Sequence, residues 1–216
     1  MVRPPSQSAV DHLILDIGGV ILPSAMPQVI AELAELSGYS QQRLWRHFNR
    51  ELFTPFWSGA VTLDAFWAEF SAYAGLPVRS ARWQTEMTRS MLAPLASIER
   101  VRQWTRIVPV GVLSNHRTEW VMPALARLGL DAVLDPILIS SATGLVKPDP
   151  RAFAQLTRLG TPAHRVLYVD DRPQAIRAAQ RLGLSTVQAH DDGAWTTRVT
   201  ELVGGDADAL TSPRRR

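Results

Sequence analysis

The sequence predicts an α/β protein in which a doubly wound parallel sheet is interrupted by one helical insertion. Three observations carry this prediction. Short β-branched runs alternate with helical stretches in the second half of the chain, about 65 residues after the first such run show helical spacing alone, and polar residues follow several of the runs. With 216 residues, 46% of them hydrophobic, the chain is long enough to bury the core of one domain that carries an insertion.

Five runs are expected to form the strands of the sheet. The first, His12–Asp16, is short, apolar and soon followed by two glycines, which is typical of a buried strand that ends in a tight turn. One helical stretch separates each later run from the next, and parallel neighbours need such crossover helices, so we expect a Rossmann-like core. The later strands are expected at Val108–Leu113, Leu134–Ser140, Val166–Val169 and Ser185–Gln188.

The block between the first and second strands is expected to form a helical cap. Its helical stretches are separated at Gly38, at Pro55 and Gly59, and at Gly75. We therefore expect a core of residues 1–22 and 94–203, a cap of residues 23–93 and a disordered tail of residues 204–216. The expected cap helices are Val29–Leu36, Gln41–Leu52, Leu63–Ala74 and Ala81–Met91.

Composition and charge argue against several classes of function. The formal net charge is +3, and Arg214, Arg215 and Arg216 alone account for that excess, so we expect no nucleic-acid partner. The chain has no cysteine, so any metal must be held by oxygen or imidazole ligands. No run reaches the roughly 18 apolar residues of a membrane span, and the first residues lack the apolar stretch of a secretory signal. We expect a cytoplasmic protein, monomeric or homodimeric, with no membrane partner.

One lysine stands out among the basic residues. Arg accounts for 22 of the 23 basic residues, and Lys147 is the single lysine. A compact ammonium group needs a different space and geometry from the forked guanidinium group of Arg. Lys147 is therefore expected at a site that requires an ammonium group, with chance survival on the surface as the alternative.

Polar residues at the expected strand ends indicate one functional site. Ligands of an open parallel sheet bind at the carboxyl ends of its strands. Asp16 ends the first strand, Ser114 and Asn115 follow the second, and the pair Asp170 and Asp171 follows the fourth. Lys147 lies in the loop after the third strand, so the single ammonium group is expected beside the carboxylates.

The three carboxylates predict a nucleophile and a metal site. Asp16 can attack phosphorus or carbon, or bind a metal, although it can also simply stabilise a turn. The adjacent Asp170 and Asp171 repel each other unless a cation compensates, and Mg²⁺ is commonly held by one or two carboxylates. Capping of the helix that begins near Pro173 would explain only one of these acids.

Ser114, Asn115 and Lys147 are the candidate phosphate-binding residues. The side chains and amides of Ser114 and Asn115 precede a helical stretch, where they can bind phosphate oxygens or serve only as a helix cap. Lys147 can neutralise both a phosphoryl group and the Asp16 carboxylate, which otherwise repel each other. The expected ligand is a small phosphorylated metabolite.

Four short segments contain the candidate site residues. In chain order they are D-I-G-G-V (Asp16–Val20), V-L-S-N (Val112–Asn115), G-L-V-K-P-D (Gly144–Asp149) and Y-V-D-D-R-P (Tyr168–Pro173). In sequence and spacing these segments resemble the four motifs of the haloacid dehalogenase superfamily. The chain looks like its phosphatase branch with a small helical cap, and it is similar to sugar-phosphate phosphatases whose first motif reads D-L-G-N-V. The resemblance implies an aspartyl nucleophile at Asp16, a phosphate ligand at Ser114, charge neutralisation by Lys147, and Mg²⁺ ligands at Asp170 and Asp171, of which Asp171 is favoured as the direct ligand.

The chain departs from the family at Gly18. The usual first motif has a second Asp there, which acts as general acid and base, whereas the carbonyl of Gly18 can serve only the metal-binding role of that position. General acid–base help contributes about 10²–10⁴ in rate. Three explanations remain open. The enzyme can use leaving groups that need less protonation, such as an anomeric phosphate. Another residue, such as His116, can replace the missing acid, or the protein is a poor or inactive relative.

Two alternatives to a Mg²⁺-dependent phosphomonoester hydrolase remain open. A metal-independent haloacid dehalogenase also lacks the second Asp, but it would leave Asp170 and Asp171 unexplained. A non-catalytic binding or regulatory module on this fold would not need Asp16 and Lys147. Within the cap, most aromatic residues are expected in the core of the helical bundle, while Phe53, Phe56, Trp57 and Arg50 could face the site.

Overall fold

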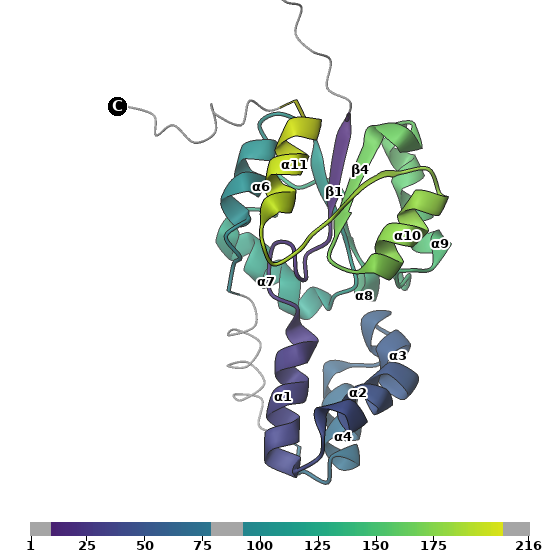
Figure 1. Ribbon diagram of the computed structural model, residues 1–216. Helices are drawn as coiled ribbons and strands as arrows, with labels where there is room; N and C mark the ends of the chain where they lie inside the picture. The colour runs from purple at the N-terminus through teal and green to yellow at the C-terminus, as the bar shows by residue number, and fades with distance from the viewer. Residues whose placement is uncertain (1–9, 79–92, 205–216) are drawn as a thin grey trace, which may run out of the picture.

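The computed structural model, described for residues 10–78 and 93–204, has a five-stranded parallel sheet at its centre (Figure 1). The strand order is β3-β2-β1-β4-β5, and all four neighbouring pairs are parallel. This arrangement confirms the predicted doubly wound α/β fold with a Rossmann-like core. The strands are β1 (His12–Leu15), β2 (Val110–Ser114), β3 (Ile137–Ile139), β4 (Val166–Asp170) and β5 (Ser185–Gln188).

The central strand β1 is buried on both faces because helices cover both sides of the sheet. Leu13 and Leu15 join one hydrophobic cluster, whereas Ile14 joins another on the opposite face. The first cluster includes residues of α6 (Ile98–Trp104), α7 (Thr118–Leu128) and α11 (Ala194–Leu202), and the second includes residues of α9 (Pro150–Ala154) and α10 (Pro173–Arg181). Consecutive strand residues point to opposite faces, so the continuous apolar run His12–Leu15 suits a strand covered on both sides.

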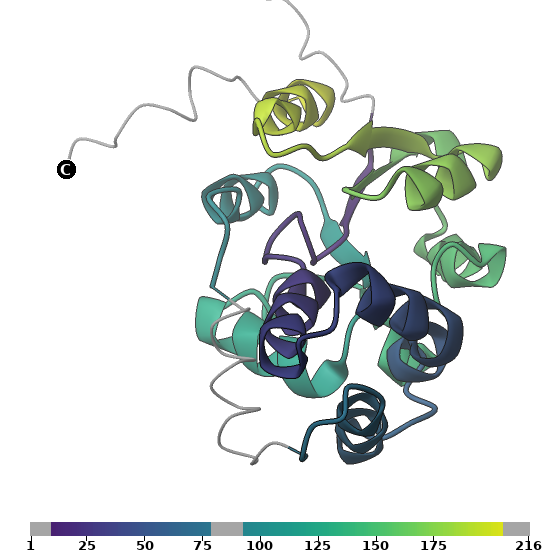
Figure 2. The same cartoon turned by 60° about the horizontal axis from the view of Figure 1, so that its bottom comes forward.

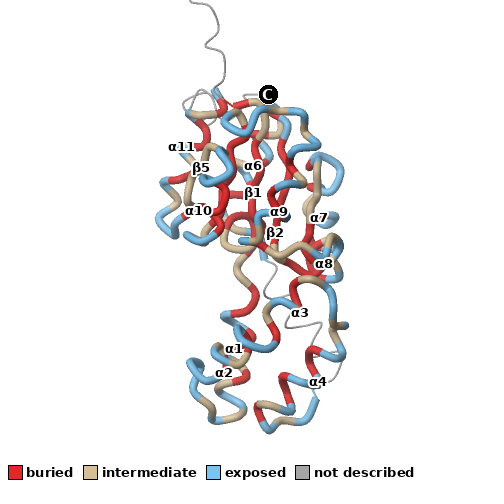
Figure 3. The backbone as a smooth tube through the Cα atoms, turned by 90° about the vertical axis from the view of Figure 1, so that its right-hand side faces the viewer, coloured by how far each residue is buried: buried red, intermediate tan, exposed pale blue. Residues whose placement is uncertain are grey.

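A group of helices that follows β1, which we call the cap helices, lies at one end of the sheet (Figures 1 and 3). Figure 2 views the molecule from this end, with the purple and blue cap helices in front of the sheet. Aromatic side chains form the interior of this group; the rings of Phe56 and Phe66, for example, stack with centroids 4.0 Å apart. The cap helices are α1 (Ala25–Ser37), α2 (Gln41–His47), η1 (Phe48–Leu52), α3 (Phe53–Trp57) and α4 (Leu63–Tyr73).

The expected helix break at Pro55 is wrong. The chain continues from α2 through the π-helix η1 into α3, and Pro55 lies inside α3. The π-helical N–H of Phe53 bonds to the carbonyl of Phe48, and Pro55 follows in the first turn of the next helix, where proline is tolerated. The wider turn of η1 thus lets a proline follow without ending the helical path.

The third strand is shorter than predicted. Pro136 lacks an N–H, and Leu134 belongs to a turn in which its N–H donates to Leu130, so β3 begins only at Ile137. A Cβ on Gly111 would lie 2.6 Å from the ring of Pro136, so a glycine is needed where β2 passes it. Three short helices complete the fold: η2 (Gln155–Leu159), which continues α9 within the helical stretch expected there, and α8 (Ser140–Thr143) and η3 (Ala163–Arg165), which were not expected as separate helices.

The cap helices contact the core through α3 and the turn that follows it. Nη1 of Arg117, the residue before α7, donates hydrogen bonds to the carbonyls of Phe56 (2.9 Å) and Val61 (3.0 Å). Oγ of Ser140 donates to the carbonyl of Trp57 at 2.6 Å. A side chain at Gly59 would overlap the backbone carbonyl of Ser141, so the glycine permits this close approach.

Some predictions concern parts of the chain outside the described residues. These are the fourth cap helix at Ala81–Met91 and all but the first residue of the tail 204–216. The core and cap boundaries and the monomeric or homodimeric state stay predictions. Within the described ranges, no helix combines the length and the apolar character needed to cross a membrane.

Candidate active site

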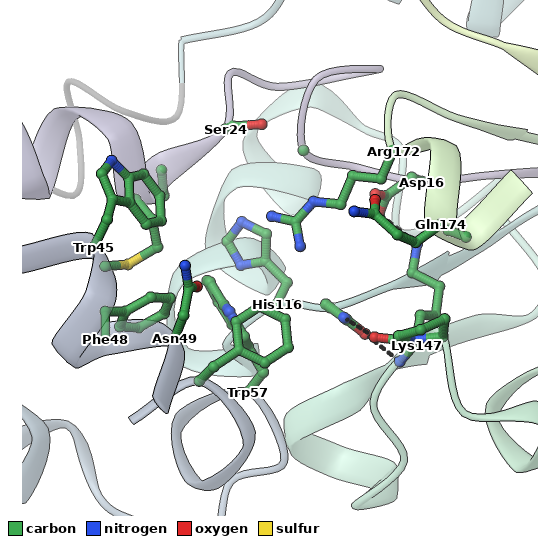
Figure 4. Close-up of a pocket in the computed structure, with 17 residues that line it drawn as sticks. Asp16, Ser24, Trp45, Phe48, Asn49, Trp57, His116, Lys147, Arg172 and Gln174 are labelled. Carbon is green, nitrogen blue, oxygen red and sulfur yellow. Dashed lines mark hydrogen bonds and ion pairs between the residues drawn. The ribbon is translucent and has the colours of Figure 1, made fainter. Parts of the chain in front are cut away.

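The strand ends bring the predicted site residues together. Asp16 directly follows β1, Ser114 ends β2 and Asp170 ends β4, and these three strands are neighbours in the sheet. Lys147 enters from the loop after α8, and its side chain is 3% exposed. Figure 4 shows Asp16 and Lys147 in the pocket that lies between the sheet and the cap helices. The carboxyl ends of the parallel strands thus bring these side chains together, at the edge where ligands of such sheets bind.

Lys147 connects two buried carboxylates. Its Nζ lies 3.1 Å from Oδ1 of Asp16 and 2.6 Å from Oδ2 of Asp170. It also donates a hydrogen bond of 2.7 Å to the hydroxyl of Tyr168, and that hydroxyl in turn donates to Asp170. Burial, followed by the charge of Asp170, raises the pKa of Tyr168, so the phenol remains protonated. The three donors of an ammonium group suit these three partners.

Asn115 fixes the backbone of Lys147. Its side-chain Nδ2 donates to the carbonyl of Lys147 at 2.8 Å, and its Oδ1 accepts the N–H of Lys147 at 2.8 Å. The side-chain amide that the sequence proposed for phosphate binding is therefore already hydrogen-bonded. A phosphate contact from Asn115 would have to come from its backbone N–H or from the second N–H of Nδ2.

Asp16, Asp170 and Asp171 form a cluster of carboxylates with one oxygen each within 4.8 Å of one another. The two oxygens of Asp170 are hydrogen-bonded, because Oδ1 accepts the N–H of Arg172 at 2.7 Å and Oδ2 faces Lys147 and Tyr168. Oδ1 of Asp171, in contrast, is buried and has no hydrogen-bond partner among the described residues. Asp171 does not cap α10, so the capping alternative considered for it does not apply.

The protonation of the cluster follows from burial and charge. Burial raises the pKa of Asp16, the neighbouring Asp170 adds to this rise, and Lys147 opposes it. Burial also acts to raise the pKa of Asp170, but the charge and hydrogen bonds of Lys147, with hydrogen bonds from Tyr168 and Arg172, outweigh it and lower that pKa. Burial and the charges of Asp16 and Asp170 raise the pKa of Asp171 to about 7. The single ammonium group of Lys147 thus does not balance the negative charges of the three carboxylates.

Two glycines shape the turn after β1. Gly19 has φ 72°, and a Cβ there would overlap the carboxylate of Asp171, so this position requires glycine. Gly18 is different: its φ lies outside the left-handed region, and a Cβ would meet only Ser24, at 3.6 Å. No backbone N–H within the described residues donates to the carbonyl of Gly18. This carbonyl is therefore available to a ligand.

A pocket of about 490 Å³ opens beside Asp16 and Lys147 (Figure 4). Its cap wall is aromatic and includes Phe53 and Trp57. The predicted residues Phe56 and Arg50 are not on this wall, because Phe56 packs inside the cap helices and Arg50 points to solvent. Ser114, Asp170 and Asp171 also lie outside the pocket lining. The remaining cap residues that line the pocket are Ser24, Ala25, Met26, Trp45, Phe48 and Asn49.

Sequence reasoning missed several pocket residues from both parts of the chain. Arg172 and Gln174 lie at the start of α10 and line the pocket from the core, and Asn49 of η1 lines it from the cap. Arg172 directly follows the carboxylate pair, so its place at a strand end could have identified it. Nothing in the local pattern around Asn49 marks it, since its position depends on how the cap helices contact the core.

Comparisons with known proteins agree with this geometry. The model of the haloacid dehalogenase-like hydrolase family matches residues 15–189. A validoxylamine A 7'-phosphate phosphatase of Streptomyces hygroscopicus subsp. limoneus is 27% identical over 150 residues, which cover 69% of this chain and 64% of that protein. A phosphoglycolate phosphatase of Pectobacterium atrosepticum is 25% identical over 195 residues, covering 83% and 80% of the two chains.

Solved structures share the fold. A haloacid dehalogenase family enzyme from Bacteroides thetaiotaomicron, crystallised with magnesium and inorganic phosphate, matches with a TM-score of 0.67 at 17% identity, over 94% of this chain and 100% of that one. The L-2-haloacid dehalogenase from Xanthobacter autotrophicus matches with a TM-score of 0.56 at 19% identity, over 93% and 86%. Both phosphate-binding and dehalogenating proteins therefore have this fold, and the site residues must distinguish between them.

Proposed function

This chain belongs to the haloacid dehalogenase-like hydrolases, and on that premise we propose that it hydrolyses a small phosphomonoester with Mg²⁺, through an aspartyl-phosphate on Asp16. The observation that carries the proposal is the position of Asp16, which lines the pocket with Oδ1 3.1 Å from Nζ of Lys147, beside two further carboxylates. The phosphatases named among its relatives support the same reaction class.

Asp16 is the proposed nucleophile. A carboxylate oxygen of Asp16 bonds to phosphorus as the bond from phosphorus to the leaving-group oxygen breaks, and water then attacks phosphorus and releases the carboxylate. The products are an alcohol and inorganic phosphate. Lys147 reduces the repulsion between the Asp16 carboxylate and the incoming phosphoryl group, and Ser114, at the end of β2, is proposed as a phosphate ligand. Two hydrogen bonds from Asn115 hold the backbone of Lys147 for this role.

The carboxylate cluster fits a magnesium ion. All the available ligand atoms are oxygens, which Mg²⁺ prefers, and the buried Oδ1 of Asp171 has no partner within the described residues. We propose that Asp16, Asp171 and the carbonyl of Gly18 hold the ion. Asp170 supports the site from behind, because both of its oxygens are already hydrogen-bonded. When bound, the ion supplies positive charge that offsets the carboxylates and the phosphoryl oxygens.

The alternative functions account for fewer of these residues. A metal-independent dehalogenase gives Asp171 no role. Burial and the neighbouring carboxylates raise the pKa of Asp171 to about 7, and a bound cation would offset this repulsion between carboxylates. A non-catalytic module gives no role to a buried Lys147 between two carboxylates.

A phosphatase screen tests the proposal. Release of inorganic phosphate is measured from sugar phosphates and aryl phosphates, with Mg²⁺ and with a chelator, for the wild type and Asp16→Asn. We expect turnover that chelator abolishes and that Asp16→Asn lacks. Turnover of a halogenated acid that chelator leaves unchanged would support the dehalogenase instead, and a folded wild type with no activity on any substrate would support the binding module.

A further inference from the structure

His116 presents an unused hydrogen-bonding atom to the pocket. It follows β2 and lines the pocket, yet it is only 2% exposed. Its Nε2 is buried and has no hydrogen-bond partner among the described residues. Figure 4 shows its ring between the cap residue Asn49 and the core residue Arg172 in that view. Buried polar atoms are normally hydrogen-bonded, so an exception at a pocket wall indicates a missing ligand.

The contacts of the ring determine which nitrogen carries the proton. The backbone N–H of Arg117 donates to Nδ1 at 3.0 Å, which requires a lone pair on Nδ1. The carbonyl of Arg117 lies 3.3 Å from Nδ1, but it already accepts the N–H groups of Trp120 and Val121. A neutral ring with an acceptor at Nδ1 has its hydrogen on Nε2. His116 therefore offers an N–H donor to the pocket.

The ring is also held neutral. It is enclosed by the indole rings of Trp57 (centroids 5.8 Å apart) and Trp120 (6.2 Å), and burial lowers its pKa to about 4. At neutral pH the ring can donate a hydrogen bond but is almost never protonated, so it does not replace the missing general acid at position 18.

We propose that the Nε2–H of His116 donates a hydrogen bond to an oxygen of the leaving group and thereby selects phosphate esters of hydroxylated alcohols over those of hydrocarbon alcohols. This inference rests on the proposed phosphatase function and defines its substrate class. A hydrocarbon leaving group would bury the donor without a partner, and sites built around such a donor discriminate strongly against analogues that lack the acceptor. Side-chain amides of Asn49 and Gln174 on the same pocket wall add polar groups suited to hydroxyls.

Two variants separate the donor from the ring. Gln places an N–H near the position of Nε2 and does not titrate, whereas Leu fills similar space without a donor. We compare kcat/KM for an inositol monophosphate and for cyclohexyl phosphate, which share a six-membered ring. His116→Leu is expected to reduce kcat/KM for inositol monophosphate by about 10–100-fold more than kcat/KM for cyclohexyl phosphate. His116→Gln is expected to keep the wild-type ratio of the two within a few-fold. Comparing variants on one substrate removes the difference in leaving-group pKa.

The outcomes distinguish this inference from the proposed function. Equal losses on both substrates in His116→Leu, or a His116→Gln variant as impaired as His116→Leu, would overturn the role of the donor. If the wild type hydrolyses no phosphomonoester, the proposed function fails. Binding of the same two phosphates to Asp16→Asn, with and without His116→Leu, is then measured by calorimetry. Selective weakening of inositol monophosphate supports the donor, and equal weakening or no binding of either phosphate overturns it.

Discussion

Oδ1 of Asp16 lies 3.1 Å from Nζ of Lys147, and both side chains are buried. Because the ammonium group also bridges to Asp170, replacing Lys147 with Met leaves two buried carboxylates without their shared cation. We expect Lys147→Met and Lys147→Arg each to reduce phosphatase kcat/KM by at least about 10²-fold, since removal of one preorganised electrostatic group costs about that much. Arg is expected to fail because the forked guanidinium cannot match three partners around one nitrogen.

Arg151→Met is the matched control for Lys147→Met. Arg151 also pairs with an aspartate, Asp149, but its side chain is 77% exposed, and exposed ion pairs contribute little. Wild-type kinetics are expected for this variant. Full activity of Lys147→Met would refute the charge-neutralising role of Lys147.

Magnesium affinity is expected to depend on Asp171. Asp171→Asn removes one carboxylate charge and one potential oxygen ligand of the ion. Oδ1 of Asp171 has no hydrogen-bond partner within the described residues, so it is free to bind the ion. We expect the affinity for Mg²⁺, measured by calorimetry without substrate, to fall by at least about 10–100-fold. A loss of this size is already seen when a residue that only hydrogen-bonds to a metal ligand is changed, and Asp171 is proposed as a ligand itself. Asp149→Asn, which changes a helix-capping carboxylate away from the pocket, should bind Mg²⁺ like the wild type. Unchanged affinity in Asp171→Asn would mean that the ion binds elsewhere.

Gly18→Asp is expected to fold and to supply a general acid. The backbone at Gly18 is not left-handed, and a Cβ would meet only Ser24 at an ordinary contact distance of 3.6 Å. The wild type should cleave aryl phosphates much faster than alkyl phosphates, and sugar-1-phosphates faster than sugar-6-phosphates. In Gly18→Asp the alkyl rate should rise by up to about 10²–10⁴, so the aryl-to-alkyl ratio falls.

Gly18→Ala is the control for Gly18→Asp, because it adds the Cβ without the carboxyl group. It should keep the wild-type ratio of aryl to alkyl hydrolysis. A wild-type rate that does not depend on leaving-group pKa would show that the enzyme already has a proton donor.

His116 is expected to lower the free energy of unfolding as the pH falls through mild acid, whereas Asp171, whose pKa burial raises to about 7, acts in the opposite direction. The pKa of His116 is lowered to about 4 by burial, below its ordinary value of 6.5, so the unfolded state takes up this proton first as the pH falls. The contribution of the neutral ring is present above about pH 6.5 and is lost as the pH falls towards 4. Between pH 7.5 and 5 the loss is about 2 kcal/mol in the free energy of unfolding.

Denaturant unfolding of the wild type and His116→Gln at these two pH values measures this loss. The carboxylates titrate equally in both proteins, so the wild type should lose about 2 kcal/mol more than the variant. The same decrease in both proteins would show that His116 is not held neutral.

The parts of the structure that the sequence predicts best are those determined by local patterns. The apolar run before Asp16 defines a central strand, and the single ammonium group of Lys147 does lie beside the carboxylates at the strand ends.

The features that the sequence does not predict depend on contacts between distant segments. The hydrogen bonds from Asn115 to Lys147 join residues 32 positions apart, and those from Arg117 to Phe56 join residues 61 positions apart. The π-helix η1, which puts Pro55 in the first turn of α3 where proline is tolerated, has no signal in the apolar spacing of the sequence. The burial of His116 likewise depends on Trp57 of the cap helices, which the order of the sequence does not place beside its ring.

Trapping of the phosphoenzyme tests the central claim most directly. The wild type is mixed with Mg²⁺ and ³²P-labelled p-nitrophenyl phosphate, quenched in acid within one turnover, and digested to locate the label. We predict acid-stable label on the peptide that contains Asp16 and none in Asp16→Asn. Release of phosphate by the wild type without any labelled protein, or equal labelling of Asp16→Asn, would contradict an aspartyl-phosphate on Asp16.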